Sequence, residues 1–188
     1  RKEIEDFGIS NLLTELNKFQ LGKRTRIERA DHYEKWNQVQ SQAEELIRSA
    51  ADTCMEQPMI ELDDAVKVAH PGIYIVRHCD DGIIYVGESS NIGTRLKTHG
   101  SATYFSAFRR NLATTRFGYE LETRDGRKRY LPEQAEAEVN AYMVNCRFSA
   151  IALFLGRYEI EELLIAEINP VLNRKSRTSK VPSTPAYA

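Results

Sequence analysis

The sequence changes character after residue 71, where two short segments rich in β-branched and aromatic residues follow one another across a turn. Residues 72–79 have the composition of a strand. Residues 80–82 (Asp-Asp-Gly) are a turn signal, and residues 83–86 have the composition of a second strand. This pattern predicts a β-hairpin, and the rest of the fold has to be built around it.

Helical periodicity occupies most of the remaining chain. The apolar stripe of residues 31–50 predicts a helix with Asp31 as its N-cap, and residues 147–155 alternate in the manner of a third strand. Further helices are predicted over residues 11–19, about 91–99, 104–113, 133–143 and 158–168. The sequence therefore predicts an α/β (α+β) fold in which helices flank a small sheet of three strands.

Composition shifts divide the chain into three parts. We expect a helical N-terminal extension over residues 1–68 and a main domain over residues 69–174. Residues 175–188 are rich in Ser, Thr, Pro and Lys, so we expect a disordered tail there.

Charge is distributed unevenly along the 188 residues. Lys and Arg number 26 and Asp and Glu number 27, a net charge of −1, which argues against a wholly basic nucleic-acid coat. Residues 91–131 nevertheless carry nine basic and three acidic residues, with a tight basic cluster at 124–129. The middle of the chain is therefore expected to meet a polyanion, although a solvated loop would produce the same cluster.

The cysteines and the apolar runs bear on the cellular compartment. Cys54, Cys79 and Cys146 are widely spaced and form no CxxC pair, so neither a disulfide framework nor a zinc site is expected. We expect buried structural cysteines in a cytoplasmic protein, with a catalytic thiol as the alternative. No apolar run approaches the ~20 residues that span a bilayer, and the acidic N-terminal residues are unlike a signal peptide.

The hairpin carries a resemblance to a known family. Residues 72–74 (Gly-Ile-Tyr), followed after ten residues by residues 85–87 (Tyr-Val-Gly), resemble the signature of the GIY-YIG nuclease family. Further matching positions follow in order at Arg95, His99, Glu161 and Asn173. The resemblance covers about residues 70–174, and relative to the family pattern the chain carries an insertion at about residues 100–146, as in some bacterial members.

The resemblance implies a fold and an activity. The family fold is a three-stranded antiparallel sheet flanked by helices, and the family cuts phosphodiester bonds in DNA with one divalent metal ion, Mg²⁺ or Mn²⁺, per active site. The catalytic residues that it implies here are Tyr74, Tyr85, Arg95, His99, Glu161 and Asn173, with Glu161 as the metal ligand.

Individual roles follow from the resemblance and from side-chain chemistry together. Tyr74 resembles the family's proton acceptor, and a phenol can be a base at neutral pH only where a neighbouring cation or hydrogen bond favours the phenolate. His99 is the protein's candidate for that help. Tyr85, which alternates with Ile84 and Val86, is expected to face the opposite side of its strand from both and to order the site's hydrogen bonds.

Arg95 and Asn173 have chemistry suited to a phosphate. The planar guanidinium of Arg95 can bind two phosphate oxygens at once. Asn173 is expected to give and accept hydrogen bonds near the scissile phosphate, with a turn residue after proline as the alternative.

Glu161 can also be argued from its position alone. On a helix its neighbours at spacings of three and four are Leu164 and Ile165, so its carboxylate lies on an apolar stripe, whereas Glu162 is expected to face water. A carboxylate in that position is costly unless it is paired or bound to a metal ion, and Mg²⁺ prefers oxygen ligands.

Basic residues and an apolar stripe suggest two kinds of partner. The side chains expected to contact the backbone of double-stranded DNA are Lys97, Arg109, Arg110, Arg127, Lys128 and Arg129. The stripe around Trp36 gives the N-terminal helices a face that could form a homodimer. The leading hypothesis is a metal-dependent DNA endonuclease that serves in restriction or another defence. The alternatives are a repair or mobile-element nuclease, an inactive nucleic-acid-binding module, and a protein-interaction domain built on the N-terminal helices.

Overall fold

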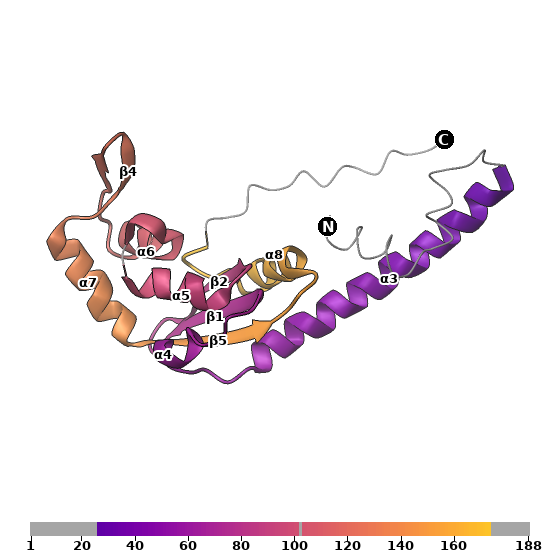
Figure 1. Cartoon of the computed structure of the whole chain (residues 1–188), viewed down its shortest axis with the longest axis horizontal. Coiled ribbons are helices and arrows are strands. Elements are labelled where there is room, and N and C mark those ends of the chain that lie inside the picture. The colour runs from indigo at the N-terminus through magenta and orange to yellow at the C-terminus, as the bar shows by residue number, and fades with distance from the viewer. Residues whose placement is uncertain (1–25, 102, 174–188) are drawn as a thin grey trace.

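A three-stranded antiparallel sheet with helices on both faces forms the centre of the molecule (Figure 1). The computed structural model describes residues 26–101 and 103–173. The strands are β1 (Gly72–His78), β2 (Gly82–Ser89) and β5 (Cys146–Ala152), in the order β2-β1-β5. Both pairs are antiparallel, which confirms the predicted hairpin and the predicted fold class.

The helices follow the predicted order, with differences at their ends. They are α3 (Arg26–Glu56), α4 (Leu62–Ala65), α5 (Ile92–Ser101), α6 (Ala107–Asn111), α7 (Glu133–Val144) and α8 (Arg157–Ile168). The predicted helix over residues 11–19 and the predicted tail over 175–188 lie outside the described residues.

The helix predicted over 104–113 is instead a series of short turns. A 3-10 turn (Thr103–Phe105), α6 and a π-helical turn (Leu112–Arg116) follow one another. The break has a local cause, because Ser106 has an extended backbone and its hydroxyl accepts a hydrogen bond from the Arg109 amide, which makes it the N-cap of a new helix.

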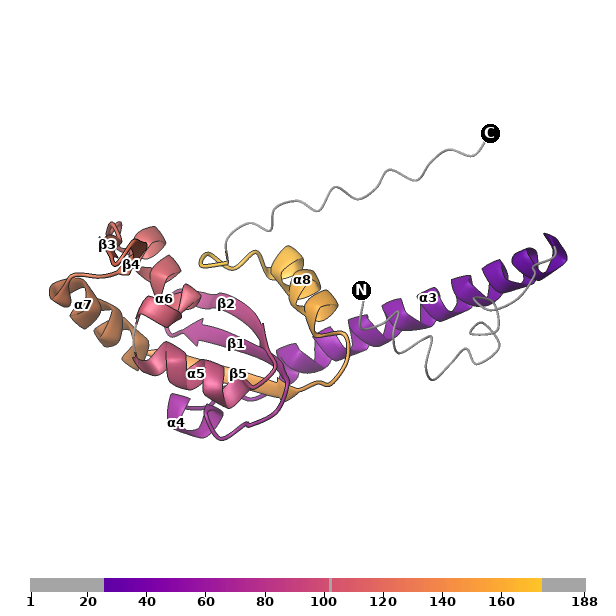
Figure 2. The ribbon, with the colours of Figure 1, turned by 45° about the horizontal axis from the view of Figure 1, so that its top comes forward.

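Helices cover both faces of the sheet and bury a core on each (Figure 2). On one face, α5, α6 and α7 pack over β1 and β5, and that core includes Val76, Leu96, Phe108, Val139 and Phe148. On the other face, α8 and the last turns of α3 pack over β1 and β2, and that core includes Ala51, Cys54, Ile73, Val86 and Leu164.

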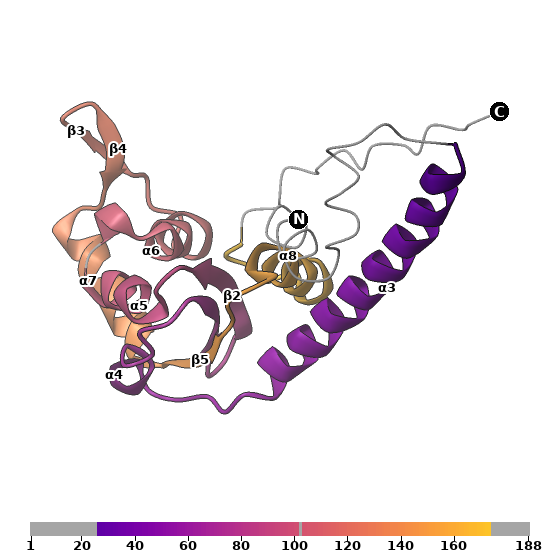
Figure 3. The same ribbon diagram turned by 45° about the vertical axis from the view of Figure 1, so that its right-hand side comes forward.

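Helix α3 has two parts with different surroundings. Its C-terminal turns contact α8 and the sheet, and Arg48 forms an ion pair with Glu167. Its N-terminal part extends away from the sheet (Figures 1 and 3). The side chain of Trp36 lies outside what the structure describes, so the homodimer remains a prediction. Among the described residues, no helix has the length and apolar character that crossing a membrane requires.

The cysteines differ from one another in exposure. Cys54 and Cys146 are buried free thiols, as predicted, and burial raises the pKa of each to about 12. Cys79 is exposed in the turn between β1 and β2, so the prediction of a buried cysteine is wrong at this position.

The insertion contains a second hairpin that the sequence analysis did not predict. Strands β3 (Glu122–Arg124) and β4 (Arg127–Tyr130) pair antiparallel and project from the end of the molecule (Figure 3). Asp125 and Gly126 between them have φ values of 50° and 72°, the left-handed conformation that such a tight turn requires. The Asp-Gly pair was the signal for this hairpin in the sequence.

A β-bulge interrupts β2 beside the Tyr-Val-Gly segment. Val76 pairs with Tyr85 and Arg77 pairs with Ile83, so Ile84 has no partner on β1. As a result Ile84 joins the same core that Tyr85 packs against, while Val86 packs into the other core. The expectation that Tyr85 faces away from both neighbours is therefore right for Val86 and wrong for Ile84.

Candidate active site

Three ring side chains meet on one face of the hairpin. Tyr74 comes from β1, Tyr85 from β2 and His99 from α5, and Tyr74 and His99 are only 2% and 1% exposed. The Tyr74 hydroxyl lies 2.8 Å from Nε2 of His99. The Tyr74 and Tyr85 rings are stacked with their centroids 6.1 Å apart, and Phe108 packs against both Tyr85 and His99. The phenol and the imidazole are thus held rigidly together.

Gly87 makes room for the Tyr74 hydroxyl. The two residues are partners across β1 and β2, and a Cβ at Gly87 would overlap the hydroxyl and ring of Tyr74. Gly87 is therefore needed at this position, because only a residue without a side chain lets β2 lie this close to the Tyr74 phenol.

We predict that Gly87→Ala lowers the rate of substrate cleavage about a hundredfold, because the added methyl group must displace Tyr74 and misplacing a reacting group by ~1 Å has an effect of that size. Steady-state kinetics would measure it. Gly82→Ala is the control, because Gly82 has φ 71° and empty space around it, so strain there destabilises the fold without moving Tyr74. Full activity of Gly87→Ala would contradict the prediction.

The imidazole of His99 is neutral. Burial lowers its pKa to about 3, and the positive charges of Arg95, Arg109 and Arg110 act in the same direction. His99 therefore cannot favour a Tyr74 phenolate as a cation at neutral pH. Of the two kinds of help that the sequence analysis considered, His99 can give only the hydrogen bond.

Burial raises the pKa of Tyr74 well above that of an ordinary phenol, and Tyr85 and the Glu161 carboxylate raise it further. The Arg95 guanidinium opposes this change. Burial and Glu161 likewise raise the pKa of Tyr85. Tyr74 is consequently protonated in the free protein at neutral pH, and positive charge brought near it would favour its ionisation.

Glu161 reaches the site from α8 on the other face of the sheet. Its Oε1 accepts a hydrogen bond of 3.2 Å from the Glu88 amide of β2, while Glu162 is exposed as expected. Burial raises the pKa of Glu161 to about 7; the nearby Glu88 and Glu162 carboxylates add to this, whereas the Glu88 amide and Arg95 oppose it. The raised pKa means that the half-buried carboxylate is costly to ionise by itself. A divalent cation that prefers oxygen ligands would offset this cost, so Glu161 is suited to hold one.

A second group of metal-binding side chains lies elsewhere. Within residues 26–101 and 103–173, the one cluster of three such groups is His78, Cys79 and Asp80 at the far end of the β1–β2 hairpin. Asp80 donates its amide to Nδ1 of His78, so that nitrogen is already engaged. Glu161, and not this turn, lies beside the paired phenol and imidazole.

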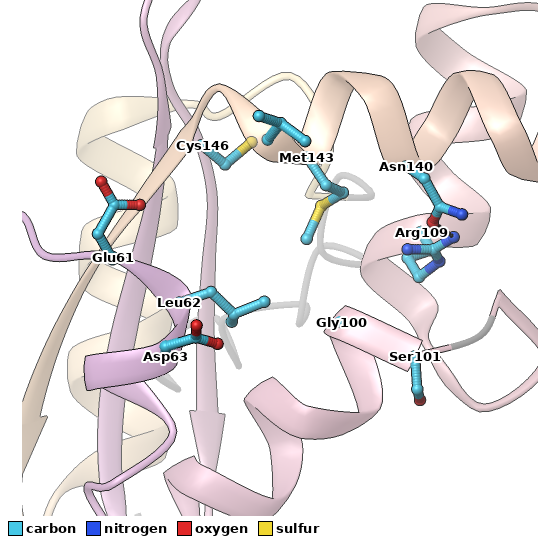
Figure 4. Close-up of a pocket in the computed structure, with 10 residues that line it drawn as sticks. Glu61, Leu62, Asp63, Gly100, Ser101, Arg109, Asn140, Met143 and Cys146 are labelled. Atoms are coloured by element: carbon cyan, nitrogen blue, oxygen red, sulfur yellow. Dashed lines mark hydrogen bonds between the residues drawn. The ribbon is translucent and has the colours of Figure 1, made fainter.

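Arg95 is exposed on α5 and faces an open groove of about 340 Å³. Ser89, Asn91, Thr94 and Phe105 also line the groove. Lys97 is exposed on the same helix. A larger pocket of about 560 Å³ lies between α4, α5 and α7, where Glu61, Asp63 and Asn140 contribute polar groups (Figure 4). Of the two, the groove is the one with a candidate catalytic residue, Arg95, in its lining.

Asn173 is hydrogen-bonded to strand β2. Its Oδ1 accepts a hydrogen bond from the Val86 amide (2.9 Å), and its Nδ2 donates one to the Val86 carbonyl (2.8 Å). Both ends of the side-chain amide are therefore occupied by β2. These two bonds hold the C-terminal segment against the strand. A carboxamide has a second N–H and a second lone pair, so contact of Asn173 with a phosphate stays a prediction.

The basic residues expected to contact DNA separate into two groups. Arg109 is 1% exposed and pairs with Glu136, so the expectation that it contacts DNA is corrected. Arg110 is half-buried and donates to the carbonyls of the 3-10 turn. Arg127 and Arg129 are exposed on β4 beside Tyr104, whereas the side chain of Lys128 lies outside what the structure describes.

Two residues of the site were missed by the sequence analysis. Ser106 lies 2.8 Å from Nδ1 of His99. Glu88 supplies the amide that holds Glu161, and its carboxylate forms an ion pair of 3.4 Å with Arg157. Glu88 directly follows the Tyr-Val-Gly segment and could have been considered, but no local pattern distinguishes Ser106.

Comparison with known proteins agrees with this geometry. Residues 54–184, well over half of the chain, match the family model of the GIY-YIG catalytic domain. No curated protein matches the chain. The match includes the hairpin with Tyr74 and Tyr85, the helix with Arg95 and His99, and the helix with Glu161. The chain therefore belongs to the GIY-YIG catalytic domain family and has the fold of a nuclease.

Proposed function

We propose that the protein is a metal-dependent endonuclease that hydrolyses phosphodiester bonds in DNA. The observation that carries the proposal is the convergence of four groups at the edge strand β2. The hydrogen-bonded pair of Tyr74 and His99 lies on one face of the sheet, and Glu161 approaches from the other. Arg95 lies near enough to influence the pKa values of all three.

Each group has a role that its environment supports. The Tyr74 oxygen accepts a proton from the attacking water, since it is the one ionisable oxygen fixed by His99. The exposed guanidinium of Arg95 binds non-bridging phosphate oxygens. Tyr85 packs on Tyr74 and restricts the position of its ring.

Glu161 would hold a divalent ion, Mg²⁺ or Mn²⁺, with water and phosphate oxygens as the remaining ligands. When bound, the ion supplies positive charge to the phosphate as negative charge develops there. That charge would lie beside Tyr74. The Glu161 carboxylate, the Arg95 guanidinium and the Tyr74 phenol would then surround one phosphate.

Cleavage assays separate this proposal from an inactive DNA-binding module. Supercoiled plasmid would be incubated with the protein in Mg²⁺, in Mn²⁺ and in excess chelator. We expect nicked or linear product with either metal ion and none with chelator. Intact plasmid under all conditions, together with retained DNA binding, would favour the inactive module.

The biological role is proposed at a coarser level. We propose double-stranded DNA as substrate and restriction or another defence as the role, with repair or mobile-element transfer as alternatives. Cleavage at fixed positions of a mapped plasmid would favour restriction. A homodimer would allow both strands to be cut, and light scattering of the free and DNA-bound protein measures that.

The exposed β3–β4 hairpin is proposed to contact the DNA backbone. Arg127 donates to the Tyr104 hydroxyl (2.6 Å), and Arg124 lies over the Tyr130 ring, so the hairpin presents cations held by aromatic side chains. Such surfaces bind phosphates through charge.

We predict that replacing Arg127, Lys128 and Arg129 together by Gln weakens DNA binding and flattens its salt dependence. Each lost phosphate contact lowers the slope of log K against log salt by roughly 0.9 for duplex DNA. Fluorescence anisotropy over a range of salt concentrations measures the slope. Replacing Arg48, Arg147 and Lys67, which form ion pairs elsewhere on the surface, is the matched control. An unchanged slope in the hairpin variant would exclude this surface.

A further inference from the structure

Ser106 contacts His99 on the side opposite Tyr74. The serine is fully buried (0% exposed) immediately before α6. Its hydroxyl oxygen accepts the amide hydrogen of Arg109 (3.0 Å) and lies 2.8 Å from Nδ1 of His99. The imidazole is therefore bound at both nitrogens, by a serine at Nδ1 and by a phenol at Nε2.

The number of hydrogens at this contact determines its direction. A serine hydroxyl has one hydrogen to donate, and a buried donor without a partner costs about 1–3 kcal/mol. Within the part of the chain that the structure describes, the group placed to accept it is Nδ1 of His99. Ser106 then donates to Nδ1, so the single proton of the neutral ring is on Nε2. The Tyr74 hydroxyl hydrogen, which Nε2 then cannot accept, has a second acceptor in the Tyr85 hydroxyl, whose hydrogen bonding with Tyr74 contributes to the pKa of both phenols.

We infer that Ser106 is a positioning residue that selects the Nε2–H tautomer of His99, so that His99 donates a hydrogen bond to the Tyr74 oxygen instead of receiving its proton. This inference deepens the proposed function and rests on it for its kinetic consequences. The tautomer itself is a property of the fold and can be measured without any substrate.

The surroundings of His99 disfavour transfer of the Tyr74 proton to its ring. If His99 accepted the Tyr74 proton, an imidazolium would form in a buried place. The groups that face the ring are Tyr74 and Tyr85 from the sheet, Arg95 from its own helix, and Phe108, Arg109 and Arg110 from α6. All the charged groups among them are cations, so they favour a neutral ring over an imidazolium.

Arg109 fixes both partners of this contact. Its amide binds the Ser106 hydroxyl, and its guanidinium donates to the His99 carbonyl (3.3 Å). Glu136 and Asn140 of α7 hold that guanidinium at 2.7 Å and 2.6 Å, and Figure 4 shows Arg109 and Asn140 pointing toward each other. The insertion therefore takes part in orienting the histidine.

Three proton transfers accompany cleavage in this scheme. The Tyr74 proton leaves to solvent, and the Nε2–H of His99 stabilises the phenolate that remains. The phenolate oxygen then takes a proton from water as the water oxygen bonds to phosphorus. The phosphorus–oxygen bond to the leaving strand breaks, and the leaving oxygen takes up a proton from solvent. His99 keeps its proton throughout.

The first test is ¹⁵N NMR of the protein labelled at histidine, with the His99 signals assigned from a His99→Gln sample. We expect Nε2 protonated and Nδ1 unprotonated across neutral pH in the parent, and a mixture of tautomers in Ser106→Ala. A parent protein with the proton on Nδ1 would overturn the inference. This measurement stands even if the protein cleaves no DNA or if Ser106→Ala does not fold.

The second test is the pH dependence of cleavage. A hydrogen bond to a charged group, such as the one from His99 to the Tyr74 phenolate, contributes more than a bond between neutral groups. Weakening it in Ser106→Ala is expected to lower kcat roughly tenfold to a hundredfold with little change in KM. The rising limb of its pH profile moves to higher pH, because the phenolate is less stabilised. Ser106→Thr keeps the hydroxyl and is expected to restore both.

The matched control is Ser101→Ala, which removes an exposed hydroxyl at the end of α5 that donates to the Thr98 carbonyl. It is expected to leave kcat and the pH profile unchanged. Loss of the N-cap alone would lower Tm without moving the pH profile. A Ser106→Ala variant with the parent's pH profile would therefore overturn the positioning role.

Discussion

Replacing Glu161 by glutamine is expected to abolish cleavage, with a loss of about a thousandfold or more. The amide keeps an oxygen that can accept the Glu88 N–H but removes the negative charge that would bind the metal ion. A bound ion contributes several kcal/mol to phosphate chemistry, and each ~1.4 kcal/mol is tenfold in rate. Plasmid cleavage over a titration of Mg²⁺ measures the loss.

Glu162→Gln is the matched control, because Glu162 is the next residue of the same helix and is exposed. It is expected to cleave at close to the parent rate. DNA binding without metal should survive both changes and become tighter for Glu161→Gln, because a negative charge beside the phosphate is removed. An active Glu161→Gln together with an inactive Glu162→Gln would refute the assignment of the metal ligand.

Tyr74→Phe is expected to lower kcat by about two to four orders of magnitude, the usual effect of removing a general base. The change deletes one oxygen and leaves the ring to pack against Tyr85 as before. It also leaves the His99 nitrogen without its partner, so Tm is expected to fall while DNA binding persists. Single-turnover cleavage and anisotropy measure the two properties separately.

Tyr142→Phe controls for the loss of a tyrosine hydroxyl. The Tyr142 hydroxyl donates to Asp81 at the hairpin turn, away from the catalytic groups. This variant is expected to lose some stability and keep its activity. Cleavage at the parent rate by Tyr74→Phe would show that another group accepts the proton.

The sequence was sufficient for the elements that have a local pattern. The hairpin followed from β-branched segments around Asp-Asp-Gly, and the half-buried Glu161 next to an exposed Glu162 followed from the helical period. The β3–β4 hairpin also had a local signal in Asp125-Gly126, but the segment was considered only for its basic cluster, which fits a solvated loop as well as a polyanion-binding surface.

Other features depend on contacts between distant segments, which no local pattern encodes. Arg109 lies in a basic stretch that suggests a surface, yet Glu136 and Asn140 from α7 bind it in the interior. Asn173 likewise binds both backbone groups of Val86, a contact that its place in the sequence does not indicate. In both cases the tertiary fold contributes the partners, so the sequence alone could not predict these contacts.

The position of Asn173 also bears on how copies of this protein behave in a concentrated solution. The outer edge of a sheet offers unpaired amides and carbonyls to which another chain can add a strand. Here Leu172 donates its amide to Ile84, and Asn173 occupies both backbone groups of Val86, so the outer edge of β2 is closed. At the opposite edge, Ile60 exchanges two hydrogen bonds of 2.8 Å with Phe148 of β5. A three-stranded sheet with both borders blocked in this way resists fibre-like growth, and Asn173→Ala is expected to reopen one border and raise the tendency to aggregate.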